Sequence, residues 1–308
     1  MEQLKEIITP ALFTGMIRIA TPLALAAIGG TICERSGIVN IALEGLILIG
    51  AFVSVVVSYF TGSAWLGVLG AVIISALFSL LLAYFSINLR ANQVIVGTAI
   101  NIFALGATGF LTDFIFKEAG ATPGVAGLNP IKIPVLCDIP WIGEIFFQQK
   151  PIIYLTFLII ALSQFILFKT KIGLRIRAVG EHPRAADTVG INVSKIRYLA
   201  VIISGALGGL AGAQLALEEI RRFVEYMSGG RGFIALAANV FGKWTPIGSW
   251  LGSLLFGFAQ ALQLRIGVFK IPPEFTNMIP YILTIIVLAG AMGRATAPVS
   301  LGKPYIKD

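Results

Sequence analysis

Carboxylate and amide side chains interrupt apolar stretches of this sequence, where polar groups are costly to bury. In CERSGIVNIALEG, residues 33–45, Glu34, Asn40 and Glu44 lie within or beside an apolar run. Asn40 and Glu44 are four residues apart, so on a helix they would share one face. A carboxylate at the centre of a bilayer costs about 2.5–3.5 kcal/mol on insertion scales. Such a side chain should therefore face a partner or a water-filled path.

A second disturbed stretch, YMSGGRGFIALAANVFGKW, covers residues 226–244 and combines a glycine-broken entry with Asn239. Short or glycine-interrupted segments at matching places in two halves of a chain are typical of transporter pathways. The candidate residues for a translocation path are Glu34, Asn40, Glu44, Asn101 and Asn239. A structural interpretation stays open, because amides often bond between packed helices and Glu44 could be neutral or paired with Arg35.

Lysine and arginine crowd the polar gap between residues 169 and 197. Loops rich in these residues stay on the cytoplasmic side of a membrane, so the gap orients the chain. Within it, GEHPRAADTVG predicts a short helix over Pro183–Val189, because proline suits a first helical turn and Gly190 a left-handed stop. A helix this short is unstable alone. It must lean on the membrane domain or on a partner, and both interpretations fit the pattern.

The segments that would position these residues are long and apolar. The chain has 308 residues, 57% hydrophobic and only 12% charged, against about 25% charged in ordinary soluble domains. Since about 20 apolar residues span a bilayer, the sequence predicts an all-α, polytopic transmembrane helical bundle forming one domain over residues 1–308. Its candidate spans are 11–33, 38–60, 64–86, 93–116, 151–168, 198–217, 246–265 and 274–293, with a shorter ninth at 224–241.

The charge pattern also predicts a topology. With the 169–197 gap cytoplasmic, the 117–150 loop is extracytoplasmic and the C-terminus is cytoplasmic. Five simple crossings would put the N-terminus outside, whereas a re-entrant or split segment near 34–50 would put it inside. Small residues repeat every four positions in Ser204, Gly208 and Gly212, which predicts close helix packing.

Motifs for several other functions are absent from the sequence. It contains no G-x-x-x-x-G-K-[ST] motif for holding ATP, and its single histidine, His182, excludes paired-histidine zinc motifs. It also lacks a G-x-S-x-G elbow. Loop topology explains the net charge of +8, so nucleic-acid binding is not expected. We expect no catalytic residue, metal site or cofactor in this chain.

Three stretches of the sequence resemble a known family. They are ERSGIVNIALEGLILIGAF (34–52), AVGEHPRAADTVGINVSKIR (178–197) and GRGFIALAANVFGKWTPIGS (230–249). They are similar to permease subunits of bacterial ABC importers of the branched-chain amino acid, ribose and simple-sugar branch, and most of all to nucleoside-type permeases. The resemblance implies a type II-like importer membrane domain with about nine or ten membrane segments, located in the bacterial cell (inner) membrane.

The resemblance also implies that the 169–197 loop engages an ATPase through a coupling helix. The residues implied in this coupling are Gly180, Glu181, His182, Pro183, Arg184, Ala186, Asp187 and Gly190. The family often has asparagine immediately before this proline, where the present chain has His182.

Partners and substrate follow from the same resemblance. It implies a cytoplasmic subunit that binds and hydrolyses ATP-Mg, a second permease subunit that is a non-identical paralogue, and an extracytoplasmic substrate-binding protein. The imported substrate would be a nucleoside, with a ribose-like sugar as the alternative, and Asn40, Asn101 and Asn239 would offer it transient hydrogen bonds. Less favoured alternatives are an ion-coupled secondary carrier, with Glu44 as its coupling acid, and, least of all, a membrane enzyme.

Overall fold

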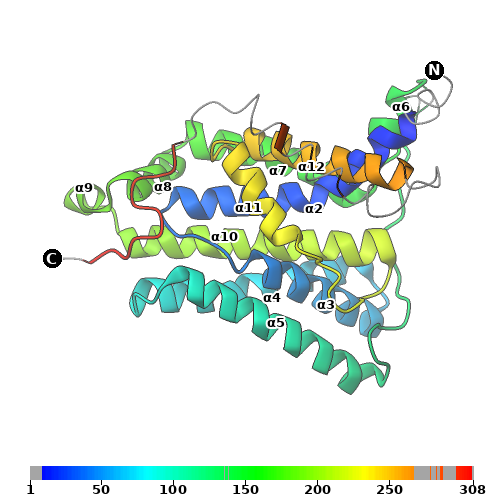
Figure 1. The fold of residues 1–308 in the computed structure, drawn as a ribbon, viewed down its shortest axis with the longest axis horizontal. Helices are drawn as coiled ribbons and strands as arrows, with labels where there is room; N and C mark the ends of the chain where they lie inside the picture. Colours follow the sequence, from blue (N-terminus) through cyan, green and yellow to red (C-terminus); the bar gives the residue numbers. More distant parts are fainter. Residues whose placement is uncertain are drawn as a thin grey trace.

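The computed structural model describes residues 9–266 apart from 135 and 138, residues 296–306, and the isolated positions 278, 282, 285 and 286. These residues form a bundle of helices, shown in Figure 1. Seven helices are long and apolar enough to cross a membrane, two of them counted with π-helical extensions. They are α2 (Pro10–Arg35), α3 (Leu43–Thr61), α4 (Ala64–Ala83), α5 (Gln93–Phe116), α7 (Pro151–Lys169), α10 (Val193–Ala213) and α12 (Pro246–Ile266).

Shorter elements complete the described bundle. The helices are α6 (Ile142–Phe146), α8 (Lys171–Glu181), α9 (Pro183–Thr188) and α11 (Arg231–Phe241). Two π-helical turns, η1 (Tyr84–Asn88) and η2 (Gln214–Ile220), extend α4 and α10. The sequence pattern did not predict these turns, and it predicted one helix in the 169–197 gap where the structure has two.

The all-α membrane fold predicted from composition is confirmed, and seven of the predicted spans match long helices to within a few residues. The predicted ninth segment, 224–241, is short and interrupted at its glycines, as expected. Only the 11 residues of α11 are helical, a length of about 16 Å or half a bilayer, because the glycines at 229 and 230 take left-handed backbone angles. The predicted span 274–293 lies outside the described residues except for four isolated positions.

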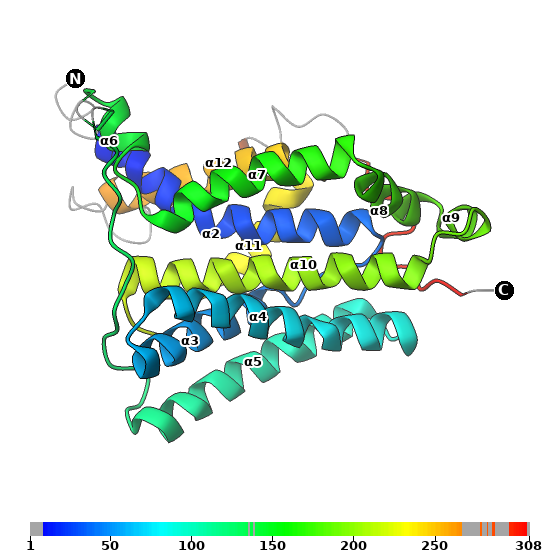
Figure 2. The same cartoon turned by 180° about the vertical axis from the view of Figure 1, so that it is seen from behind.

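The two long loops lie at opposite ends of the bundle. In Figures 1 and 2, α8 and α9 protrude at one end and α6, from the 117–150 loop, lies at the other. Helix α2 starts near α6 and ends near α8, and α3 returns toward the α6 end. The segment near 34–50 is therefore split, as one alternative proposed, but together with α3 it still makes a single crossing. This agrees with five crossings before α8.

Small residues on α10 allow the other helices to approach closely. An added Cβ at Gly212 would collide with the carbonyl of Ile47 on α3, and one at Gly209 with the carbonyl of Ala71 on α4. Gly208 faces Leu46 of α3 in the same ridge. The predicted small-residue packing is confirmed, and α10 packs closely against α2, α3 and α4.

Candidate translocation and coupling site

The first interruption is the non-helical segment 36–42 between α2 and α3. Two of its backbone groups are bound by side chains of α5. Gln93 accepts a hydrogen bond from the Val39 N–H (2.7 Å). Asn101 donates to the Ile41 carbonyl (2.9 Å) and accepts from the Gly45 N–H (2.8 Å). Asn101 therefore replaces helical hydrogen bonds that this segment lacks.

Asn40 lies within this segment and is fully buried. Its amide nitrogen donates to the Ser204 hydroxyl of α10 (2.8 Å), while its Oδ1 has no hydrogen-bond partner among the described residues. Because residues 36–42 are not helical, the expectation that Asn40 and Glu44 share one helix face is wrong. Asn40 points to α10, whereas Glu44 points to α11.

Glu44 caps the N-terminus of α11. Its two carboxylate oxygens accept hydrogen bonds from the backbone N–H groups of Gly230 and Gly232, each at 2.7 Å. A carboxylate at this place satisfies unpaired donors and is stabilised by the helix dipole. Gly232 is required here, since an added Cβ would collide with the Glu44 backbone. The alternative pairing of Glu44 with Arg35 is not found among the described residues: Arg35 lies beside Glu181 and binds the Trp244 carbonyl, whereas Glu44 binds the start of α11.

Glu34 and Asn239 are brought together at the buried contact of α2, α11 and α12. The Glu34 carboxylate accepts from the Asn239 amide (2.7 Å) and from the Trp244 indole N–H (2.5 Å). The Asn239 carbonyl oxygen lies 2.7 Å from the Thr31 hydroxyl, which is 2.8 Å from the Ser249 hydroxyl. All five side chains are less than 9% exposed. This network ties α2, α11 and α12 together.

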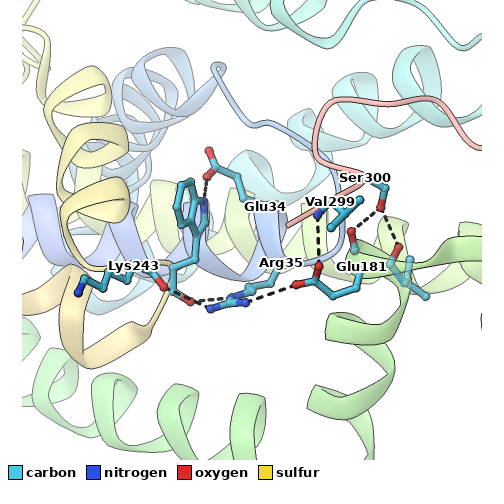
Figure 3. Close-up of polar contacts among 9 residues, drawn as sticks. Glu34, Arg35, Glu181, Lys243, Val299 and Ser300 are labelled. Carbon is cyan, nitrogen blue, oxygen red and sulfur yellow. Dashed lines mark hydrogen bonds and ion pairs between the residues drawn. The ribbon is translucent and has the colours of Figure 1, made fainter. Parts of the chain in front are cut away.

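Arg35 joins this region to the end of α8, as Figure 3 shows. Its guanidinium donates to the backbone carbonyls of Trp244 (2.8 Å) and Lys243 (3.2 Å) and lies 3.9 Å from the Glu181 carboxylate. Gly180 packs so closely on the Arg35 carbonyl that any side chain there would collide with it. The end of α8 therefore touches both α2 and the turn between α11 and α12.

The predicted coupling residues divide between the surface and the interior. Helix α9, Pro183–Thr188, agrees with the helix predicted at 183–189. His182, Arg184 and Gly190 are exposed, and Glu181, Pro183 and Asp187 are half-buried. Gly180 and Ala186 are buried within this chain, where Ala186 packs with Val179 and Val193. These two positions support the helix rather than present a surface. Val189, beside the end of α9, is 73% exposed.

Several residues of the site were missed by sequence reasoning. The sequence pattern does not assign Trp244 to the site, and it includes Arg197 only in the basic bias of the 169–197 gap. Thr31, Gln93 and Ser249 carry no periodic or charge signal. A signal was available for Arg197, since a basic residue in an apolar helix must find acceptors.

Comparison with known proteins identifies the family. A family described as "Branched-chain amino acid transport system / permease component" matches residues 12–288. The chain belongs to this permease family.

The permease has relatives over nearly its whole length. It is 49% identical to the guanosine ABC transporter permease protein NupQ of Bacillus subtilis (strain 168), over 99% of this chain and 98% of the relative. It is 43% identical to the nucleoside ABC transporter permease protein NupC of Lactococcus lactis subsp. cremoris (strain MG1363), over 95% and 96%. A third relative, the putative glucose ABC transporter permease protein TsgC13 of Haloferax volcanii, is 36% identical over 95% and 94%.

Glu44→Gln tests the cap of α11 in the permease. Glutamine keeps the size of the side chain, but its amide NH₂ group faces one of the two backbone N–H groups. One hydrogen bond is therefore lost, and two donors face each other in its place. We expect the free energy of unfolding to fall by about 1–3 kcal/mol and amide exchange at residues 230–233 to accelerate. Thermal unfolding in mild detergent and hydrogen-exchange mass spectrometry measure both.

The matched control is Glu144→Gln on α6, whose side chain is exposed. It makes the same chemical change and should leave both quantities at their wild-type values. Equal behaviour of the two variants would contradict the capping role of Glu44.

Proposed function

We propose that this permease is the membrane-spanning subunit of an ATP-driven ABC importer for nucleosides. The observation that carries the proposal is identity of 49% and 43% over nearly the whole chain with relatives named as guanosine and nucleoside ABC transporter permeases. The same membrane fold and the two interrupted segments support a transport role, since broken segments provide polar groups where a substrate must pass.

The path in this proposal runs beside the segment 36–42 and α11. Asn40, Asn101 and Asn239 supply amides that match a polar, uncharged nucleoside, and Glu34 and Glu44 hold the surrounding elements in place. Asn40 and Asn239 are 0% exposed, so substrate reaches them only after α11 moves relative to α2 and α3. Alternating access by this movement requires weak, transient contacts rather than a tight site.

In the same proposal the α8–α9 end is cytoplasmic and docks an ATP-binding subunit. The protrusion of α9 from the bundle, with Ala185 and Thr188 exposed, supports this assignment. Movement of α9 would reach the path through Gly180, Arg35 and the turn at Trp244. ATP-Mg would bind in the partner, so this chain carries no hydrolytic step.

The remaining partners belong to the same proposal. A second permease subunit, a non-identical paralogue, would complete the path, and an extracytoplasmic binding protein would deliver substrate at the α6 end. The C-terminus would lie on the cytoplasmic side. A ribose-like sugar remains the second candidate substrate, favoured by the 36% identity with the relative named as a putative glucose permease.

Uptake into proteoliposomes tests the substrate and the energy source. The complete importer, with its ATPase and binding protein, should accumulate radiolabelled guanosine only with internal ATP, and other nucleosides should compete. Excess ribose, glucose or leucine should not. Competition by ribose at equal concentration would favour the sugar importer. Uptake that ignores ATP but collapses with an uncoupler would replace the proposal with a secondary carrier.

Ala185→Arg tests the docking face of α9. Ala185 is exposed, so arginine should leave the fold intact while blocking a closely packed partner. We expect binding of the ATPase to weaken by about 2 kcal/mol, roughly thirtyfold, as for a central interface residue. Co-purification and titration of the ATPase onto the permease in detergent measure this loss.

Ile172→Arg is the control, because Ile172 is exposed on α8 and lies roughly three helical turns before α9. It should bind the ATPase as wild type does. Full ATPase binding by Ala185→Arg would reject α9 as the docking helix.

A further inference from the structure

Residues 298–303, near the C-terminus, form a segment of consecutive turns that lies against the α8–α9 end of the bundle (Figures 1 and 3). We call this segment the C-terminal clasp. It touches two elements that are far apart in sequence: the last turn of α8 and the non-helical segment 36–42. No part of the transport proposal above uses it.

On one side the clasp binds the end of α8. The Ser300 N–H donates to the Gly180 carbonyl (3.0 Å), and its hydroxyl donates to the same oxygen. The Val299 N–H donates to the Glu181 carboxylate (3.2 Å). Carbonyl groups in the last turn of a helix have no N–H donor within that helix. The clasp supplies such donors at the end of α8. Ser300 is 7% exposed, which keeps water from competing for its two bonds to Gly180, whereas the bond to Glu181 is exposed.

On the other side the clasp binds segment 36–42. The Gly302 N–H donates to the Gly37 carbonyl (3.0 Å). Arg197 of α10 bridges the two, donating from Nε to the Ser36 carbonyl (3.2 Å) and from Nη1 to the Lys303 carbonyl (3.3 Å). Its side chain is buried, with 1% exposure. Gly37 has a φ of +95°, and an added Cβ would lie 2.9 Å from Nη2 of Arg197.

The direct contacts between α8 and α2 are of a different kind. Gly180 packs on the Arg35 carbonyl, and such packing resists a push but not a pull. The Glu181–Arg35 ion pair spans 3.9 Å, and the Glu181 side chain is 40% exposed, so solvent weakens it. Among the described contacts of these residues, only the clasp joins the end of α8 to segment 36–42 by hydrogen bonds: through Ser300 to Gly180, and through Gly302 to Gly37.

We infer that the C-terminal clasp, with Arg197, is a positioning element that makes α8–α9 and segment 36–42 move as one unit during transport. The inference rests on the proposed function, in which α9 receives the movement of an ATPase. The clasp transmits a pull on α9 to the unwound segment and so to Asn40 and the surrounding path. Without it, ATP hydrolysis continues but moves the path less.

The test uses the complete importer in proteoliposomes and a chain that lacks residues 298–308, with a chain lacking only residues 307 and 308 as control. We expect the longer truncation to assemble and hydrolyse ATP, while nucleoside uptake per ATP falls at least about fivefold, the lower edge of typical coupling between sites. The control should match wild type. Unchanged uptake per ATP in the longer truncation would overturn the inference.

A second readout needs no transported substrate. In the wild-type complex, a non-hydrolysable ATP analogue should change amide exchange in residues 36–46, and the longer truncation should lose this response. If the wild-type importer fails to take up nucleosides, the substrate proposal fails. The exchange response still shows whether the clasp couples α8–α9 to segment 36–42. A full exchange response in the truncated chain would refute the coupling role of the clasp.

Arg197→Met and Arg197→Lys separate a coupling role from a structural one, and they serve if the truncation does not assemble. Lysine retains a charged donor and should recover part of the uptake per ATP that methionine loses. A merely structural role would lower uptake and ATP hydrolysis in the same proportion in both variants, and that result would also overturn the inference.

Discussion

A non-helical stretch inside a membrane bundle must have its backbone N–H and C=O groups satisfied by other parts of the protein. Segment 36–42 meets this requirement through three sources that are distant in sequence. Gln93 and Asn101 come from the α5 side, Arg197 from α10, and Gly302 from the C-terminal clasp. The segment is therefore held from several directions, and its position depends on all of these elements at once.

This constraint explains why the polar residues are buried instead of lining an open channel. Asn101 substitutes for missing helical bonds, Glu44 closes the start of α11, and Glu34 joins α2 to α11 and α12. Each polar group stabilises an interrupted element in the present conformation. In the proposed transport cycle these groups would exchange partners as the helices move, and so offer polar contacts without a permanent tight site.

The sequence predicted the features that local chemistry determines. Apolar runs gave the long helices, and Pro183 with Gly190 gave the position of α9. The glycines near 229 and 230 indicated the broken entry of α11, although not that residues 224–230 would lack a helix. The α10 packing was readable because Gly208 and Gly212 recur at helical spacing.

The remaining features depend on contacts between distant segments. No local pattern shows whether Asn40 binds α10 or shares a helix face with Glu44, because the answer depends on whether residues 36–42 are helical. That in turn depends on Gln93 and Asn101 more than fifty residues later in the chain. The pairing of Arg197 with residues near the C-terminus is equally invisible to periodicity, and so is the burial of Ala186.

The most direct test of the account is amide exchange across residues 36–46 in Asn101→Leu, in mild detergent. Leucine fits a similar volume but leaves the Ile41 carbonyl and Gly45 N–H without partners, at a cost of about 1–3 kcal/mol. Exchange there should accelerate roughly five- to 150-fold. Thr98→Val, which removes only a bond within α5, should not change it. Unaltered exchange in Asn101→Leu would contradict the claim that side chains from α5 hold the unwound segment in place.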